Sequence, residues 1–566
     1  MIYQSPYPAF NVPTTLSISQ FLLRSNPDDV SHDRIIVSDF DRPSHGLGYG
    51  EARTRAAQAA ASLRDKHGVT EGDVVATFGQ NSVNHLLVWH AVFWAGGCIS
   101  AINPQATSYE LVHYLGISKP KVVAVDAALL PTLTEALHAS SLAQTPQIIV
   151  IEDFTLHSGD VHEPKFPKDF VRFQTRSLPP LDLRSRDNRE VPAAMCFSSG
   201  TSEGVVLSHH NLIACLLTVR ATSPHLHGSE TREVFFPSFA HIYGLVSAVL
   251  LPVYVGCSIV VMKRFEFMAY LRKCVEIKAT ILRLVPALAA RMIKDRESKE
   301  LDLRSVKNIM VSGAALSPNV STICFDGNRG RGREIVQDLR QMLSPDAAVL
   351  NGFGMTEATI MMLRETQSHR AGSLGRPVAG ASVRIVDDDL NDVQPGRVGE
   401  CLVKGPTVFM HWCDNPGETS AAFTKDGWLR TGDMLHIDED GYFWMTGRKK
   451  ELIKFKGNQV APAEIEALLL AHPAVTEAGV CGMHDAAQDT ELPTGCIVLA
   501  SGVKSEDISG IIRDVSSFVN VRLAKYKSLR GGLFTVDALP KGPTGKLLRR
   551  ELPAIVTEKI KLQSKL

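Results

Sequence analysis

The sequence has no excess charge of either sign, since Lys and Arg together number 60 and Asp and Glu together also number 60. A surface without net charge lacks the broad attraction that nucleic acids and anionic membranes exert on basic proteins, so neither is expected as a partner. Cys-X-X-Cys pairs are also missing, although the chain has ten cysteines. This scatter predicts the reduced thiols of an intracellular protein rather than a zinc site or a disulfide framework.

Uninterrupted apolar runs long enough to cross a membrane are lacking as well. The nearest case, Leu245 to Met262, is divided by Pro252 and Gly256. That division predicts a buried helix followed by a core strand, and no transmembrane segment. The first 17 residues have no basic stretch followed by an apolar one, so no secretory signal is expected.

The chain ends in Ser564, Lys565 and Leu566, after a polar stretch that should be exposed. A C-terminal Ser-Lys-Leu is an address read by the peroxisomal import receptor. We therefore expect that receptor as a partner and the peroxisome as the location.

The length of 566 residues exceeds what one compact core usually holds, so two or more domains are expected. Buried strands alternating with helices predict an α/β N-terminal domain of largely parallel sheets over residues 1–447. Short strands separated by turns predict a β-rich subdomain over about 373–446. Residues 448–566 predict a small α+β domain, with helices over 463–472 and 505–521 and strands over 478–482 and 494–500.

Five segments, in chain order, carry residue types suited to nucleotide chemistry. In "SSGTSEGV", from Ser198, backbone N–H groups and hydroxyls can wrap phosphate oxygens, and Ser208 can cap the following helix. In "NGFGMTEAT", Phe353 offers a flat face for a base, Thr356 can bond a phosphate, and Glu357 is a hard oxygen ligand for magnesium. A plain loop and a capped helix are the alternatives.

The other three segments lie toward the C-terminus. In "GWLRTGDMLHID", Asp433 can accept both hydroxyls of a ribose, or can simply close a β-turn. The fourth segment is "GRKKELIKFKGNQVAPAEIE". In "LPKGPTGKLLRREL", Lys546 follows a Pro/Gly-rich turn that suits delivery of a mobile positive charge, with a solvated lysine as the alternative.

Together the five segments resemble the adenylate-forming superfamily over residues 17–551, and "HIYGL" and "LIKFKGNQVAPAEIEALLLAHPAV" look closest to its 4-coumarate–CoA ligase-like branch. The resemblance implies an ATP-dependent acid–CoA ligase. A carboxylate would attack the α-phosphate of Mg·ATP to give an acyl-adenylate and pyrophosphate, and the thiol of coenzyme A would then displace AMP. ATP, Mg²⁺, coenzyme A and a carboxylic acid are thus implied, with no tightly bound cofactor.

The resemblance also implies a role for each matching residue. Lys546 would bridge the carboxylate and the α-phosphate, Glu357 would hold magnesium, and Thr356 would bond a phosphate. The β- and γ-phosphates would contact Ser198, Ser199, Gly200 and Thr201. The adenine would lie against Gly313, Ala314, Ala315, Gly352 and Phe353, and the ribose against Asp433 and Arg448.

The small domain would rotate between the two half-reactions. Lys450 matches the hinge, Lys454 and Gln459 match residues that face the adenylate during thioester formation, and Lys456 and Gly457 lie where coenzyme A would approach. His241 matches a gate between the acid pocket and the pantetheine tunnel, with a satisfied core histidine as the alternative.

The residues that align with acid-lining positions are small or apolar: Ala240, Gly244, Gly354, Ile360 and Met361. A polar group left without a partner in such a pocket costs about 1–3 kcal/mol. An apolar acid is therefore expected, either an aryl acid without ring hydroxyls or a medium-chain aliphatic acid.

Three features depart from the family pattern. The phosphate loop is shorter than the usual S-S-G-T-T-G-x-P-K-G-V, lacks its lysine and adds Glu203. Loss of one donor to a developing anion typically costs ~2.7–4 kcal/mol. "STICFDGNRGRG" (321–332) interrupts a helix with three glycines and should form a surface loop, and Gly447 replaces the usual aspartate.

These departures leave alternatives open. The altered loop suits a non-catalytic relative that binds nucleotide or acyl-CoA. A luciferase-type oxygenase fits the same motifs, whereas an amino-acid adenylation domain would need a carrier segment that the sequence lacks. A deletion and an insertion together could also result from misplaced splice junctions, a hypothesis that the transcript sequence would test.

Overall fold

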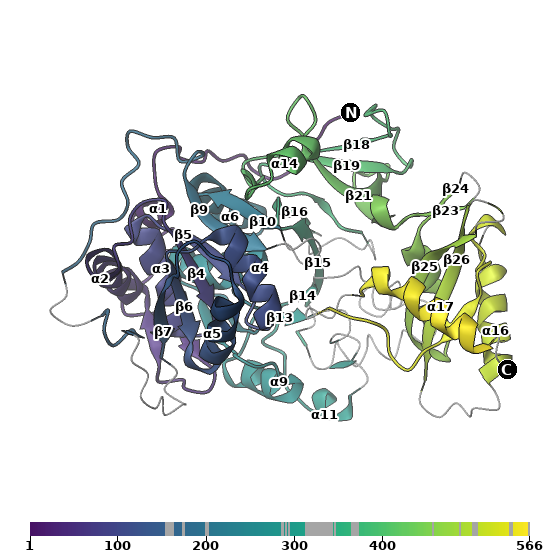
Figure 1. Cartoon of the computed structure of the whole chain (residues 1–566), viewed down its shortest axis with the longest axis horizontal. Coiled ribbons are helices and arrows are strands. Elements are labelled where there is room, and N and C mark those ends of the chain that lie inside the picture. Colours follow the sequence, from purple (N-terminus) through teal and green to yellow (C-terminus); the bar gives the residue numbers. More distant parts are fainter. Residues whose placement is uncertain are drawn as a thin grey trace.

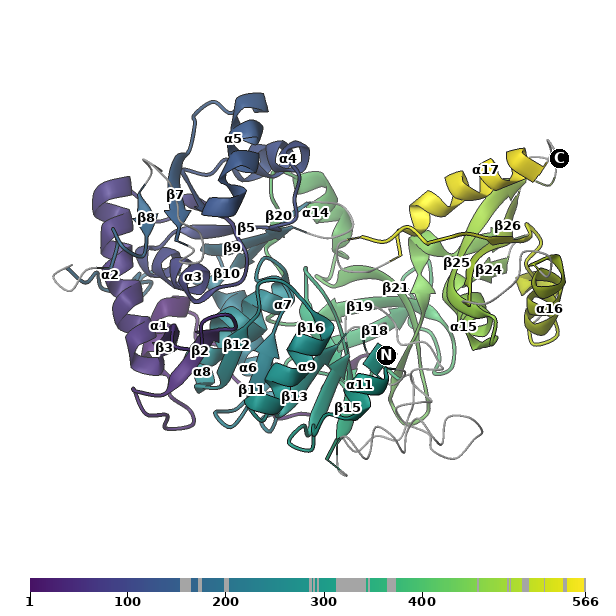
Figure 2. The ribbon, with the colours of Figure 1, turned by 90° about the horizontal axis from the view of Figure 1, so that it is seen from below.

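The computed structural model describes most of the chain: residues 1–152, 164–171, 176–197, 203–284, 288, 291–292, 295–311, 343–344, 347–363, 373–455, 458–485, 488, 490–500, 508–523, 525–542 and 547–563. Figures 1 and 2 show a large N-terminal part and, at one end of it, a smaller α+β part built from the last hundred or so residues.

An eight-stranded sheet forms the centre of the N-terminal part. Its strands run parallel from β9 to β8, while β10 and β20 add antiparallel at the other edge. In spatial order they are β20 (His411–Trp412), β10 (Gly204–Ser208), β9 (Pro192–Phe197), β5 (Cys98–Ile102), β4 (Val74–Phe78), β6 (Val122–Asp126), β7 (Gln147–Ile151) and β8 (Lys165–Phe166). The expected parallel strands are confirmed, with an antiparallel edge.

Helices cover both faces of this sheet. The helices α4 (Ser108–Ser118) and α5 (Leu130–Ala139), which follows the short η1 (Ala127–Leu129), pack with Phe78 and Val125 on one face. On the other face lie α2 (Tyr49–His67) and α3 (Val83–Ala95). Helix α3 starts at Ser82, whose side chain accepts from the amide of His85, and stops at Gly96, whose φ of 91° suits glycine.

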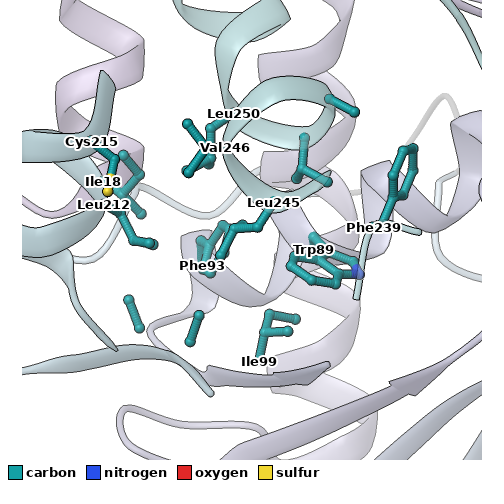
Figure 3. Packing of buried hydrophobic residues seen from close by; sticks show 14 of the residues in the cluster. Ile18, Trp89, Phe93, Ile99, Leu212, Cys215, Phe239, Leu245, Val246 and Leu250 are labelled. Carbon is teal, nitrogen blue, oxygen red and sulfur yellow. The ribbon is translucent and has the colours of Figure 1, made fainter. Parts of the chain in front are cut away.

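The apolar run that begins at Leu245 packs onto α3. Figure 3 shows Leu245 and Val246 above Trp89 and Phe93. This run forms the π-helical η2 (Leu245–Leu250) and α8 (Leu251–Val255), after the short α7 (Ile242–Gly244), and then continues as strand β12 (Ser258–Val261). The predicted buried helix followed by a core strand is therefore confirmed.

Two smaller sheets flank this core. One has the order β11 (Arg232–Phe235), β12, β2 (Ile35–Asp39) and β3 (Gly46–Gly48). The other has the order β13 (Ile281–Leu284), β14 (Asn308–Val311), β15 (Ala348–Met355), β16 (Thr359–Leu363) and β17 (Arg376–Pro377). Among the described residues, this part also contains the helices α1 (Ile18–Arg24), α6 (His209–Thr222), α9 (Phe267–Glu276) and α11 (Arg296–Lys299). As predicted, Ser208 caps α6 through a capping box.

A buried ion pair ties the two small sheets together. Arg283 of β13 bonds Glu233 of β11 through two nitrogens, one of them 3.0 Å from Glu233 Oε1, and both side chains are almost fully buried. Arg283 also donates to the hydroxyl of Tyr243 in α7. Because a charge left alone in such a place is costly, this pair fixes α7 relative to β13.

A five-stranded antiparallel sheet contains most of the predicted β-rich subdomain. Its order is β1 (Tyr3–Gln4), β18 (Ser382–Val386), β19 (Gly399–Lys404), β21 (Leu429–Ile437) and β22 (Phe443–Arg448), with α14 (Pro416–Ala422) beside it. The range 373–446 does not form a closed unit, since β17 pairs with β16, β20 pairs with β10, and β1 comes from the N-terminus.

The C-terminal part begins with η3 (Lys449–Glu451), β23 (Ile453–Phe455) and β24 (Asn458–Val460). It continues as α15 (Pro462–Ala471), β25 (Val475–Asp485), β26 (Thr490–Leu499), α16 (Ile508–Asn520), η5 (Lys525–Lys527), β27 (Leu533–Thr535), η6 (Arg549–Glu551) and α17 (Leu552–Gln563). The predicted helices and strands are confirmed within a few residues at their ends. Helix α15 packs on β25, which pairs with β26.

The cysteines and helices agree with two further expectations. The nine cysteines in the described ranges all carry free thiols, and all but Cys413 are buried. Within those ranges, no helix is both long and apolar enough to span a bilayer.

Candidate functional site

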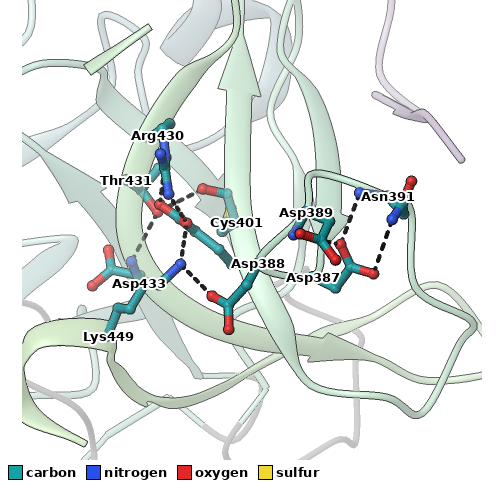
Figure 4. Close-up of polar contacts among 10 residues, drawn as sticks. Asp387, Asp388, Asp389, Asn391, Cys401, Arg430, Thr431, Asp433 and Lys449 are labelled. Atoms are coloured by element: carbon teal, nitrogen blue, oxygen red, sulfur yellow. Dashed lines mark hydrogen bonds and ion pairs between the residues drawn. The ribbon is translucent and has the colours of Figure 1, made fainter. Parts of the chain in front are cut away.

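The hairpin of β21 and β22 places Asp433 opposite Arg448. Arg448 Nε lies 3.2 Å from Asp433 Oδ1, and the aspartate side chain is almost fully buried while the arginine is half exposed. The preceding Gly432 has a φ of +70°, which suits glycine. The amide of Asp433 donates to Thr431 Oγ1 (3.1 Å), whose hydroxyl donates to the carbonyl of Cys401 (2.8 Å; Figure 4). The two predicted ribose residues therefore lie together.

A second ionic cluster fixes the chain just before the predicted hinge. Lys449 Nζ lies 3.0 Å from Glu400 Oε2 and 2.7 Å from Asp388 Oδ1 (Figure 4). Burial alone would raise the pKa of Glu400, but hydrogen bonds from Arg430 and Lys449 lower it. The carboxylate therefore stays charged and holds Lys449 on the N-terminal sheet, immediately before the exposed Lys450.

The turn after β15 buries Thr356 and Glu357. The amide of Phe409 donates to the carbonyl of Glu357 (2.8 Å), which fixes the backbone there. Burial raises the pKa of the Glu357 carboxyl, and a hydrogen bond from its own backbone amide opposes this. The charge of Glu203 raises the pKa by a smaller amount, and the charge of Arg448 lowers it. The charges of Glu203 and Arg448, which belong to two other segments, therefore act on this one carboxyl group.

The shortened phosphate loop joins two neighbouring strands. Strands β9 and β10 pair antiparallel with Phe197 opposite Gly204, so residues 198–203 connect the two strands of a hairpin. Asn415 Nδ2, at the start of α14, donates to Glu203 Oε1 (3.2 Å) and holds that end of the loop. Ser198, Ser199, Gly200 and Thr201 lie outside the described residues.

The proposed adenine wall is described in part. Gly352 and Phe353 lie half-buried on β15, and Phe353 packs at the edge of the main core. Gly313, Ala314 and Ala315 lie outside the described residues, as does the predicted loop 321–332. The stacking of Phe353 on a base therefore stays a prediction.

The residues predicted to line the acid pocket differ in their surroundings. Ala240 and Met361 are buried in the main core, Ile360 is half-buried and Gly354 is exposed. A Cβ at Gly354 would lie 1.9 Å from the carbonyl oxygen of Thr359, and one at Gly244 would lie 2.1 Å from that of Ser238. Both glycines are therefore required by the backbone, and their small size does not by itself describe the acid.

His241 lies at the start of α7 with an exposed side chain, where Nδ1 accepts from the amide of Tyr243 (3.2 Å). The alternative of a satisfied core histidine is therefore wrong. Sequence reasoning missed Tyr243 and the Arg283–Glu233 pair that contacts it. The one available signal was a charged residue inside the otherwise apolar strand "ATILRLVP".

The C-terminal site residues are only partly described. Lys454 is exposed on β23, where its amide donates to Glu491 Oε2 (2.7 Å). Asp388 has a lowered pKa, mainly through Lys449, with Arg430 and Lys454 contributing at longer range. Gln459 lies opposite Lys454 on β24. The other predicted residues lie outside the described ranges: Lys456, Gly457, Lys546, Ser564, Lys565 and Leu566.

Gly447, which replaces an expected aspartate, lies opposite Met434. A Cβ there would be in ordinary contact with Leu452 and Ala461, at 3.5 and 3.7 Å. The replacement therefore relieves no backbone clash. In the described part of the chain, no group of three or more His, Cys, Asp or Glu side chains is arranged to hold a metal ion.

Two family models match the chain. The model of the AMP-binding enzyme matches residues 26–412, and that of the AMP-binding enzyme C-terminal domain matches residues 464–546. The 4-coumarate–CoA ligase-like 4 of Oryza sativa subsp. japonica is 32% identical over 518 residues, covering 89% of this chain and 88% of the relative. The peroxisomal OPC-8:0-CoA ligase 1 of Arabidopsis thaliana is 32% identical over 521 residues, covering 90% and 88%.

Solved structures share the fold at lower identity. An anthranilate CoA ligase, AuaEII, in complex with anthranoyl-AMP gives a TM-score of 0.81 at 24% identity, covering 98% of this chain and 99% of that one. A benzoate CoA ligase from Burkholderia xenovorans LB400 gives 0.79 at 23% identity, covering 95% and 100%. The chain therefore belongs to the AMP-binding, adenylate-forming enzymes, in their AMP-forming acyl-CoA synthetase and 4-coumarate–CoA ligase-like branch.

Proposed function

We propose that the protein joins an apolar aryl or medium-chain aliphatic carboxylic acid to coenzyme A through an acyl-adenylate. The observation that carries the proposal is the pairing of residues from two separate motifs, since Arg448 Nε lies 3.2 Å from Oδ1 of the buried Asp433. The charge of Arg448 also acts on the buried carboxyl of Glu357. A nucleotide needs this combination: an acidic acceptor for ribose hydroxyls, a cation, and a carboxylate for its metal.

In the first half-reaction, attack on the α-phosphate needs positioning and charge neutralisation more than covalent help. Asp433 would accept hydrogen bonds from the ribose, next to Arg448. Thr356 and the 198–201 loop would bond the phosphates, and Lys546 would bring positive charge between the acid and the α-phosphate. The adenine would lie between Phe353 and residues 313–315.

Magnesium would accompany ATP. Mg²⁺ in such sites is usually held by one or two carboxylates together with substrate phosphates and water. The donor set fits, because Glu357 offers a carboxyl whose pKa is raised mainly by burial and further by the charge of Glu203, and a cation beside it would favour the charged form. When bound, the metal would neutralise phosphate charge.

In the second half-reaction, the C-terminal domain (448–566) would turn about Lys450 relative to residues 1–447. Lys454 and Gln459 would then face the adenylate, coenzyme A would approach along Lys456 and Gly457, and His241 would open the path to the acid. The exposed positions of His241 and Lys454 support this assignment.

The choice of an apolar acid as substrate is supported by the apolar side chains at the proposed lining positions Ala240, Ile360 and Met361. Relatives and structural neighbours are named for coumarate, OPC-8:0, anthranilate and benzoate. Tyr243 adds one polar group near this region, and its hydroxyl is already engaged by Arg283.

The central prediction concerns Lys546. Purified protein with ATP, Mg²⁺ and a panel of apolar acids should release acid-dependent pyrophosphate, and should form a thioester once coenzyme A is added. Lys546→Ala should lower pyrophosphate release by about a hundredfold or more, because a preorganised charge on the transferring phosphoryl group is lost. Lys425→Ala, at an exposed lysine, is the control.

An unchanged rate for Lys546→Ala would contradict the role of that lysine. No pyrophosphate with any acid in the unaltered protein would instead favour a non-catalytic nucleotide or acyl-CoA binder. That second candidate is favoured by Glu203 in a lysine-free loop. Light emission with an acid, ATP and oxygen would identify a luciferase-type oxygenase.

A second prediction uses the charge of Glu203. Glu203→Gln removes a like charge near Glu357, so the pKa of Glu357 should fall and its carboxylate should persist to lower pH. The acid limb of the pH profile of kcat/KM for ATP should therefore move down by about one pH unit or less. Glu439→Gln, at an exposed turn, should leave the limb in place. Identical profiles for all three proteins would exclude this coupling.

We also propose import into peroxisomes through Ser564–Leu566, supported by the relative named as peroxisomal. A protein fused at its N-terminus to a fluorescent marker should collect in peroxisomes, and removal of the last three residues should disperse it, because the import receptor reads a free C-terminal tripeptide. Imaging beside a peroxisomal marker measures this. Punctate signal that survives the deletion would refute the address.

A further inference from the structure

The segment that follows Lys546 is anchored by a single arginine. Arg549, the first residue of η6, lies with its guanidinium among three different elements. Arg549 Nε donates to Glu451 Oε2 (3.1 Å). Two nitrogens bond Glu466, with Nη2 3.1 Å from Oε2 and Nη1 on the other oxygen. Nη1 also donates to the carbonyl of Val480 (2.5 Å). The arginine thus joins η3, α15 and β25.

The anchor is itself fixed. Glu466 on α15 also accepts a hydrogen bond from the amide of Val480 (2.7 Å), so β25 holds its carboxylate independently of the arginine. Both Arg549 and Glu466 have less than a fifth of their side-chain surface exposed. A guanidinium fork that meets a carboxylate with two nitrogens has one preferred orientation, which a lysine cannot reproduce.

The described residues on either side of 543–546 contact the same strand, β25. The amide of Leu548 donates to the carbonyl of Pro540 (2.9 Å), and Lys541 bridges antiparallel to Leu547. Lys541 Nζ lies 2.5 Å from Glu477 Oε1 of β25. Leu547 packs over Gly479, because a Cβ added to that glycine would lie 3.1 Å from the Leu547 side chain. Both ends of residues 543–546 are therefore bound to β25.

Glu451 adds a connection to the hinge. It is the residue directly after Lys450, and its carboxylate is the third partner of Arg549. A rotation at Lys450 would carry Glu451, Glu466 and Arg549 together, because all three follow the hinge in the chain. Rotation at Lys450 would therefore leave this contact intact, so η3 and Arg549 would turn together.

We infer that Arg549 is a positioning residue for Lys546: through Glu451 and Glu466 it ties the chain directly after Lys546 to the hinge segment and to α15. This inference rests on the proposed function, in which Lys546 serves the adenylation half-reaction alone. Thioester formation relies on Lys454 and Gln459 instead.

The test separates the two half-reactions. Arg549→Lys keeps the charge but loses the contact of two guanidinium nitrogens with Glu466. Glu451→Gln removes only the charge of the carboxylate next to Lys450. Arg549→Lys should slow acid-dependent pyrophosphate release at least tenfold, with Glu451→Gln slowing it less. Thioester formation from a chemically prepared acyl-adenylate and coenzyme A should change less than threefold in both. Arg550→Lys, at the exposed neighbouring arginine, should change neither rate.

Hydrogen exchange gives a reading that needs no activity. In Arg549→Lys, peptides covering 540–551 should exchange at least threefold faster than in the unaltered protein and in Arg550→Lys, while peptides of β21 should not change. Unchanged exchange, or equal slowing of both half-reactions, would overturn the inference. If the unaltered protein makes no pyrophosphate, the proposed function fails. Hydrogen exchange of residues 540–551 then still decides whether Arg549 anchors this segment.

Discussion

The pairing of β21 with β22 is the constraint on which the rest of the site depends. Its register sets Asp433 opposite Arg448, with 3.2 Å between Oδ1 and Nε. Because β22 runs directly into Lys449 and Lys450, the same register fixes where the C-terminal part begins. The Glu400 carboxylate strengthens this connection by holding Arg430 of β21 and Lys449 at once. The proposed ribose site and the proposed hinge are therefore both positioned by one hairpin.

The shortened loop is compatible with this arrangement. Residues 198–203 connect adjacent antiparallel strands, and hairpin connections tolerate changes of length without altering the strands that they join. What the loop adds is the charge of Glu203, which is held by Asn415 and acts on the carboxyl of Glu357. The shortening therefore leaves β9 and β10 paired and alters the electrostatics of one buried carboxyl group.

Sequence reasoning predicted local features well. The Ser208 cap, the buried helix and core strand after Leu245 and the C-terminal strands follow from short-range signals, and the motif residues Glu357 and Asp433 were assigned from their family positions. It could not predict contacts between residues far apart in the chain. Arg283 with Glu233 and Tyr243, and Arg549 with Glu466, depend on the packing of separate elements. The small size of Gly244 and Gly354 was attributed to the acid, but the backbone around them requires glycine.

The most direct test of the preassembled site is the preference for a ribose with free hydroxyls. The equilibrium affinity for AMP should exceed that for 2′,3′-dideoxy-AMP by about tenfold or more in the unaltered protein, because hydrogen bonds to a buried carboxylate are lost. Asp433→Asn should shrink that preference, whereas Asp387→Asn, in the exposed β18–β19 turn, should keep it. Because misfolding would weaken both nucleotides alike, the ratio reports the contact itself. An equal preference in all three proteins would contradict a ribose site at Asp433.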